Sequence, residues 1–297
     1  MMSDIILLDG ATGSELERRG VEIGLPLWSA NAILHAPEVV QQVHRDYLEA
    51  GAWAITTNTF RTHQRSLAKA GMGDRAGELT RIAVEIARAA RDGANTDALV
   101  LGAVAPLEDC YRPHLAPDAD TCHREHAQCI EHLVEAGVDM VLIETMCSAR
   151  EATAAADAAR SIAPSRWGIS FCLADDGKVL DGTALEDIIP AIADARWIGI
   201  NCVAATVLAR HVAMLRSALD IAGLTGDAGP RIAAYGNVGH ADGHGAWIST
   251  DAVAPKRFAE HAMDWVRAGA TVVGGCCGTT PATIEHVSST LAEAGKR

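Results

Sequence analysis

The sequence predicts a single α/β domain, residues 1–297, that folds as a (β/α)8 TIM barrel. Short apolar runs alternate with longer amphipathic segments along the whole chain, and there are eight such runs. A length of 297 residues suits eight strand–helix units, and no linker or internal repeat divides the chain. A doubly wound sheet is the alternative. It has weak support because the segment DGATGS at residues 9–14 lacks the G-x-G-x-x-G spacing of a dinucleotide site.

Several of the apolar runs end at glycine or polar residues, as buried strands do. The predicted strands are residues 5–8, 54–57, 98–103, 140–143, 168–172, 197–200, 232–235 and 271–274. The segments between them have apolar residues at spacings of three and four, and their alanine and arginine content favours helix. The predicted helices are residues 37–50, 78–91, 124–136, 150–162, 206–222, 256–268 and 281–294.

Three long irregular segments follow predicted strands, where a barrel carries its functional loops. They are residues 20–36, 105–120 and 236–254. The last contains GHADGHG at residues 239–245, whose histidines and aspartate resemble a metal tract. Its glycines favour a solvated loop instead.

The composition narrows the possible partners. The 25 basic and 38 acidic residues leave a net charge of -13, which opposes nucleic acids and anionic membranes and favours cationic small molecules. No apolar stretch reaches the ~20 residues of a membrane span. Residues 1–4 carry no basic segment, and Asp9 comes too soon for a signal peptide. We therefore expect a cytoplasmic protein whose eight cysteines bind metal or pack rather than form disulfides. The sequence does not predict the oligomeric state.

Three cysteines follow two of the predicted strands. Cys276 and Cys277 lie in the segment GGCCG, and Cys202 ends the segment GINC. Space-filling thiols or a strained disulfide between neighbours are the alternatives. In a barrel, however, the ends of these two strands can converge on one ion, and three thiolates leave the fourth position of a Zn²⁺ tetrahedron open, as in catalytic sites. We therefore predict that these three residues bind Zn²⁺ and are catalytic.

The other five cysteines lack paired ligand spacing and are predicted to serve packing. They are Cys110, Cys122, Cys129, Cys147 and Cys172.

A zinc ion with three thiolate ligands favours a particular chemistry. Its formal charge of about -1 makes it a poor electrophile, but it can hold a fourth sulfur. A substrate thiol in the open position loses its proton and remains nucleophilic. The site therefore predicts alkyl transfer to a thiol at neutral pH. A zinc or redox sensor is the non-enzyme alternative, but it gives no role to the acidic residues at the same end of the barrel.

Polar and aromatic residues near other strand ends are candidate substrate contacts. Asp9 and Glu144 are predicted to recognise a cation, such as the ammonium group of an amino-acid thiol. Asp9 could instead cap the following helix. Trp28, in the first long loop, either fills the barrel rim or holds a cationic methyl donor through a cation–π contact of ~0.5–2 kcal/mol. Thr57 and Asn237, next to the second and seventh strands, complete the predicted substrate-binding set.

Six segments, in order along essentially the whole chain, resemble the homocysteine S-methyltransferases, which include the betaine-dependent enzymes and the homocysteine module of cobalamin-dependent methionine synthase. They are LDGATGSEL (8–16), LWSA (27–30), TTNTF (56–60), IET (143–145), GINC (199–202) and GGCCG (274–278). The paired cysteines with the upstream Asn-Cys are the most specific part.

The resemblance implies a fold, a cofactor and substrate contacts. It implies a (β/α)8 barrel whose three cysteines bind zinc, with the sulfur of homocysteine in the fourth position. Asp9 and Glu144 match positions that hold the amino group of homocysteine, and Thr57 matches a residue near its polar end. Trp28 matches a position associated with the methyl donor.

The LWSA segment is most similar to enzymes that use S-methylmethionine or S-adenosylmethionine. Two departures lie in loops at the same end of the barrel: APLEDCYRP (105–113) replaces a Gly-Pro-Tyr-Gly type segment, and Gly236 replaces the proline that commonly precedes the asparagine. Our hypothesis is methyl transfer from a sulfonium donor to homocysteine, forming methionine. The alternatives are betaine or a separate corrinoid protein as donor, and selenohomocysteine or another small thiol as acceptor.

Overall fold

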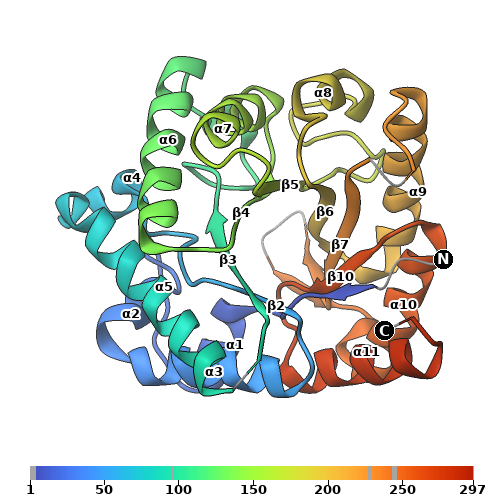
Figure 1. Ribbon diagram of the computed structural model, residues 1–297, viewed down its shortest axis with the longest axis horizontal. Coiled ribbons are helices and arrows are strands. Elements are labelled where there is room, and N and C mark those ends of the chain that lie inside the picture. The colour runs from blue at the N-terminus through green and yellow to red at the C-terminus, as the bar shows by residue number, and fades with distance from the viewer. Residues whose placement is uncertain (1–4, 95, 227–228, 243–245, 297) are drawn as a thin grey trace.

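Eight parallel strands form a barrel surrounded by helices in the computed structural model, which describes residues 5–94, 96–226, 229–242 and 246–296 (Figure 1). The strand order around the barrel is β1-β10-β7-β6-β5-β4-β3-β2. A bridge between Leu8 and Ala54 joins the first and last strands of this order, so the predicted barrel is confirmed. The strands are β1 (Ile6–Leu7), β2 (Ala54–Thr56), β3 (Leu99–Val104), β4 (Met140–Met146), β5 (Trp167–Phe171), β6 (Trp197–Ala204), β7 (Arg231–Asn237) and β10 (Val272–Gly275).

All seven predicted helices form, with ends within a few residues of the predicted ones. They are α3 (Pro37–Glu49), α5 (Ala76–Gly93), α6 (Ala119–Ala136), α7 (Ala149–Ile162), α9 (Ala205–Ile221), α10 (Pro255–Ala268) and α11 (Pro281–Glu293). The sequence analysis missed four shorter helices: α1 (Thr12–Arg18), α2 (Asn31–His35), α4 (Gln64–Ala68) and α8 (Leu185–Ile192). Each is too short to show a helical repeat, and α8 contains Pro190.

Two apolar layers hold the barrel together. Nine buried side chains fill its interior: Leu8, Ala54, Leu101, Met140, Leu142, Trp197, Ala233, Tyr235 and Val272. A larger cluster packs the outer faces of the strands against the helices, and alanines let α7 lie close to the sheet. Because the interior is filled, a solute can reach polar groups only at the ends of the barrel. We call the end formed by the C-terminal ends of the strands the mouth.

Strands β4, β6 and β7 are longer than predicted, which corrects the placement of four residues. Glu144, Asn201, Cys202 and Asn237 lie within these strands and not after them. Each strand shifts register against its neighbour at this level, and Thr145 (φ 61°) and Cys202 (φ 58°) adopt the left-handed backbone conformation. Such an irregularity lets a strand continue while the direction of its side chains changes.

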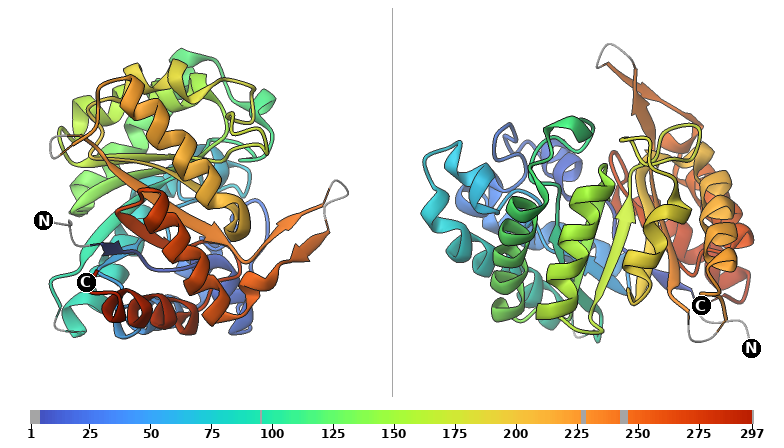
Figure 2. Two further views of the ribbon diagram at one scale, coloured as in Figure 1. Left: turned by 90° about the vertical axis from the view of Figure 1, so that its right-hand side faces the viewer. Right: turned by 90° about the horizontal axis from the view of Figure 1, so that it is seen from above.

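The loop predicted at residues 239–245 is partly a strand. Gly239–Ala241 forms β8, which pairs antiparallel with β9 (Trp247–Ser249) in a hairpin that projects from the body (Figure 2). His240 and Ala241 are exposed, as expected of a solvated segment. Two of the predictions concern residues outside the described part of the chain. They are the end of the glycine-rich loop, residues 243–245, and the N-terminus, residues 1–4. Within that part, no helix combines the length and apolar character needed to cross a membrane.

Candidate metal and substrate site

Three sulfur atoms meet at the mouth. The Sγ atoms of Cys202 on β6 and of Cys276 and Cys277 after β10 all lie within 4.8 Å of one another, and those of Cys202 and Cys277 are 3.8 Å apart. A zinc tetrahedron with ~2.3 Å Zn–S bonds has sulfur atoms ~3.8 Å apart, so the donor set fits this ion. Cys202 is buried, whereas Cys276 and Cys277 are partly exposed.

Polar neighbours hold this cluster in place. The Oδ1 atom of Asn237 accepts a hydrogen bond from the backbone N–H of Cys277 (3.0 Å), and its Nδ2 lies 3.9 Å from Sγ of Cys202. The hydroxyl of Tyr111 lies 2.9 Å from the same sulfur. Asn237, predicted as a substrate contact, is therefore placed as a buried support between two of the cysteines.

The three thiols of the cluster differ in pKa. Hydrogen bonds from Cys276 and Cys277, and then from Tyr111, lower the pKa of Cys202 well below its usual value. The hydrogen bond to Cys202 raises the pKa of Cys276 and of Cys277 well above it. These contacts favour the deprotonated form of Cys202 over that of Cys276 and Cys277. A cation that coordinates all three sulfurs must displace the protons that they carry.

The glycines of the GGCCG segment are required by close packing. A Cβ on Gly275 would lie 2.8 Å from Cβ of Thr279, whose hydroxyl donates to the carbonyl of Cys276 (2.7 Å) and accepts from the N–H of Ala11 (3.1 Å). Gly278 has φ +81°, a conformation that glycine adopts at little cost. The turn that carries both cysteines therefore requires glycine at positions 275 and 278.

Gly275→Ala is expected to lower the free energy of unfolding by about 1–3 kcal/mol, because the added methyl group overpacks the contact with Thr279. Displacing Thr279 should also weaken metal binding. Gly24→Ala is a matched control, since nothing lies within 4 Å of the added Cβ there. Denaturant unfolding and chelator competition measure both effects. Equal stability and metal affinity in the two variants would contradict this account of the turn.

Two carboxyl groups lie at the same mouth. Asp9 is buried and accepts hydrogen bonds from the N–H (2.7 Å) and hydroxyl (3.0 Å) of Thr56. The alternative that Asp9 caps a helix is wrong, because α1 begins after Ala11 without a side-chain cap. Glu144 is half-buried and hydrogen-bonds the hydroxyl of Tyr235.

Burial changes the ionisation of both acids. It raises the pKa of Asp9 to about 7. Burial, followed by the negative charges of Asp9 and Cys202, raises the pKa of Glu144 to about 8. A cationic ligand between them would lower both pKa values, because the charged carboxylates would then be paired.

Thr57 and Trp28 differ in how freely they face a ligand. The hydroxyl of Thr57 accepts from the N–H of Ala103 (3.2 Å) and contacts the hydroxyl of Thr59 (2.8 Å), which itself donates to the carbonyl of Ala103. These contacts use the one hydrogen of Thr57 within the protein. Trp28 is 39% exposed at the rim and packs its indole on Gly13. Trp28 thus remains open to a ligand, whereas Thr57 is engaged with β3.

The sequence analysis did not find two tyrosines of the site. Tyr111 lies in the segment that departs from the family pattern, and Tyr235 lies inside β7. The loop with Tyr111 is held by Glu108, which forms ion pairs with Arg65 (3.2 Å) and Lys69 (2.5 Å). No local pattern marks a tyrosine as a partner of a distant sulfur or carboxyl group, so only the assembled barrel identifies these contacts.

The five remaining cysteines are free thiols. Burial raises the pKa of every one of them, so they are neutral at physiological pH, as packing residues are. The Sγ atom of Cys172 lies 3.8 Å from the carbonyl oxygen of Cys202, next to the cluster but outside it.

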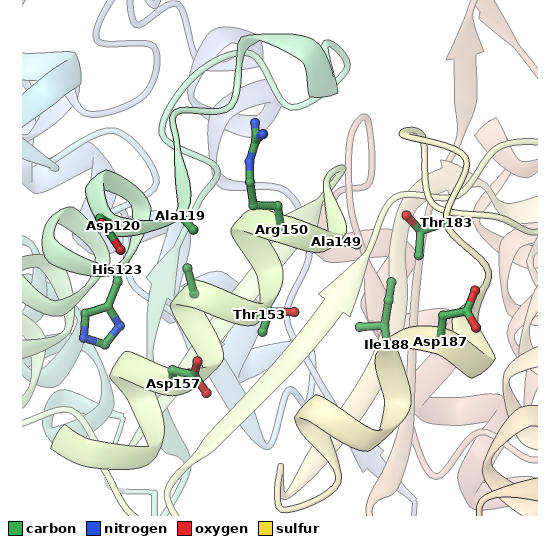
Figure 3. Close-up of a pocket in the computed structure, with 11 residues that line it drawn as sticks. Ala119, Asp120, His123, Ala149, Arg150, Thr153, Asp157, Thr183, Asp187 and Ile188 are labelled. Carbon is green, nitrogen blue, oxygen red and sulfur yellow. The ribbon is translucent and has the colours of Figure 1, made fainter.

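A surface pocket of about 480 Å³ lies elsewhere, between helices α6, α7 and α8 (Figure 3). Its charged side chains include Asp120, Asp157 and Asp187, together with Arg150. None of its lining residues belongs to the cysteine cluster or to the two acids of the mouth. The pocket is a feature of the helical layer and is separate from the candidate site.

Thiols and acids that converge at the C-terminal ends of barrel strands define an enzyme active site. The chain belongs to the homocysteine S-methyltransferase family, whose family model matches residues 6–291. It is 32% identical to the homocysteine S-methyltransferase of Escherichia coli (strain K12), covering 95% of this chain and 93% of that protein. It is 29% identical to the selenocysteine methyltransferase of Astragalus bisulcatus, covering 96% and 92%.

A solved structure supports the same family assignment. The metallated form of the homocysteine methyltransferase MmuM from Escherichia coli superimposes with a TM-score of 0.81 at 30% identity, covering 97% of this chain and 96% of that chain. The family resemblance and the barrel fold inferred from the sequence are confirmed, and the protein is an enzyme of the methyltransferase class.

Proposed function

We propose that this enzyme transfers a methyl group from a sulfonium donor to the sulfur of homocysteine and forms methionine. The observation that carries the proposal is the cluster of Cys202, Cys276 and Cys277 at a mouth that also holds the buried Asp9 and the half-buried Glu144. Family membership supports the reaction class. We further propose that the protein acts in the cytoplasm, where thiols stay reduced.

The three cysteines would hold Zn²⁺. The spacing of their sulfur atoms fits this ion, and their thiol chemistry suits it. Zinc, when bound, would lower the pKa of a substrate thiol and so make it nucleophilic at neutral pH. Asn237 and Tyr111 would keep the sulfur of Cys202 oriented and partly neutralise its charge through hydrogen bonds.

Asp9 and Glu144 would bind the ammonium group of homocysteine. Both pKa values lie near neutrality, so the arriving cation would ionise both acids and release protons. This contact would orient the substrate sulfur toward the cysteine cluster. Transfer then requires the donor methyl carbon within ~3–3.5 Å of that sulfur, in line with the breaking bond.

The donor site would lie on the rim beside Trp28. An exposed indole attracts sulfonium and quaternary ammonium groups, and the chain has a net charge of -13. These features favour a cationic methyl donor, and both a sulfonium and betaine carry that charge. A second acceptor, a selenol amino acid, is a candidate because the relatives include a selenocysteine methyltransferase.

The test is a donor screen with metal analysis on one purified sample. S-Methylmethionine, S-adenosylmethionine and betaine are each incubated with homocysteine, and methionine is measured. Methionine formation from a sulfonium at about one zinc per chain supports the proposal. Competition by selenohomocysteine measures acceptor preference. A zinc-loaded protein that is inert with all three donors would overturn the sulfonium assignment, and activity with betaine alone would replace it.

A further inference from the structure

Buried hydrogen bonds join four neighbouring strands around Asn201. The Oδ1 atom of Asn201 accepts from the N–H of Thr145 (2.9 Å) and from the hydroxyl of Ser170 (2.8 Å). Its Nδ2 donates to the hydroxyl of Thr145 (2.8 Å). All three residues are buried. Because a backbone N–H can only donate, the orientation of this amide is determined by its contact with Thr145.

The same contacts support two strained backbone positions. Thr145 and Cys202 have φ values of 61° and 58°, and a β-branched residue rarely adopts this conformation. Such strain persists only where the surroundings hold it. Asn201 makes two hydrogen bonds to Thr145 and precedes Cys202 in the chain, so it ties both irregular strand segments together.

The network continues to Glu144 by a second route. Ser170 donates its hydrogen to Asn201, and its oxygen also contacts the hydroxyl of Tyr235. Tyr235 also contacts Glu144. Glu144 is thus held through the backbone of Thr145 and through Tyr235, and both routes meet at Asn201. Cys202 is held through the peptide bond that follows Asn201.

We propose that Asn201 is a positioning residue that sets the separation between the carboxyl group of Glu144 and the sulfur of Cys202, and so selects homocysteine over cysteine. Homocysteine has one more methylene group than cysteine between its α-carbon and its sulfur. If Glu144 holds the amino group and the cysteine cluster holds the sulfur, a rigid separation suits one chain length. This inference rests on the proposed function. A misplacement of ~1 Å can cost about 100-fold in rate, which is enough to discriminate the two acids.

The test compares Asn201→Ala with two further variants. Asn201→Ala is expected to lower kcat/KM for homocysteine about 100-fold and to lower the ratio of homocysteine to cysteine activity at least about tenfold. Adding Thr145→Gly should restore about tenfold of the loss, because glycine adopts a positive φ without support. Thr80→Val is the matched control. It removes the buried contact between the hydroxyl of Thr80, on α5, and that of Thr62, and it should leave the ratio unchanged.

The cobalt-substituted protein gives a readout that does not need turnover. Asn201→Ala should shift the sulfur-to-cobalt absorption bands of the protein alone. It should also alter how these bands respond when homocysteine is added. Thr80→Val should change neither. If the wild type methylates no thiol, the proposed function fails, but these spectra still test the positioning role. If Asn201→Ala does not fold, Ser170→Ala removes a single bond of the network and should move the ratio and spectra in the same direction. An unchanged ratio and unchanged spectra in a folded, metal-loaded Asn201→Ala or Ser170→Ala variant would overturn the inference.

Discussion

Replacing Cys277 with alanine is expected to abolish stable metal binding and to lower kcat/KM by at least ~1000-fold, since metal-ion catalysis contributes several kcal/mol to the barrier. Two thiols cannot complete a three-sulfur site, and the amide of Asn237 would lose the geometry it now holds between Cys202 and Cys277. The barrel should remain folded because Cys277 is partly exposed at the mouth and lies outside the apolar core. Metal analysis, circular dichroism and initial rates measure these effects.

Cys129→Ala is the matched control for this experiment. Cys129 is a partly exposed free cysteine on α6, away from the cluster. Its replacement should leave metal content and turnover unchanged. A Cys277→Ala variant that retained a full equivalent of metal and normal turnover would show that the three-cysteine site is not the catalytic centre.

Glu144→Gln is expected to lower kcat/KM for homocysteine about 100-fold, mainly through KM, because a buried charge pair with the ammonium group is lost. The substitution keeps the size of the side chain and a hydrogen-bond partner for Tyr235. Glu38→Gln is the control, since it makes the same charge change at an exposed position of α3. Loss of activity in both variants alike would show a general charge effect and not recognition at the mouth.

The pH dependence of kcat/KM should distinguish the role of Asp9 from that of Glu144. In the wild type, kcat/KM for homocysteine should rise with pH through about 7 and about 8, as Asp9 and Glu144 ionise. In Glu144→Gln the inflection near 8 should disappear and the one near 7 should remain. A pH profile that keeps both inflections would assign the upper one to another group.

The free energy of unfolding of the ligand-free protein should fall as the pH rises, whereas kcat/KM should rise. Folding raises the pKa of Glu144 from its ordinary value of 4.5 to about 8, so the folded state binds this proton more tightly. Its stabilisation is therefore complete below about pH 4.5 and is lost as the pH rises through about 8. Glu144→Gln should lose less stability than the wild type over this interval. Denaturant unfolding at pH 5 and pH 9 measures the difference.

The fold was predictable because parallel strands buried on both faces appear as short apolar runs, and eight of them alternate with helices long enough to show a repeat. The helix α8 escaped prediction because eight residues with an internal proline show little periodicity. The hairpin β8–β9 escaped it because most of its residues are exposed and no apolar alternation marks them. The strand ends were misjudged at β4 and β6, where polar residues continue the strand.

The sequence by itself determined which groups the site contains: three thiols, two acids, and the order of strands that brings them to one end of a barrel. The tertiary structure alone decided how these groups are held and charged. Thr57 turns its hydroxyl to β3, Asn237 supports the cysteines, and Tyr235 and Asn201 link Glu144 to Cys202. The reason is physical. Residue type sets what an atom can bind, whereas pKa, backbone strain and hydrogen-bond partners depend on the register between strands that are far apart in the chain.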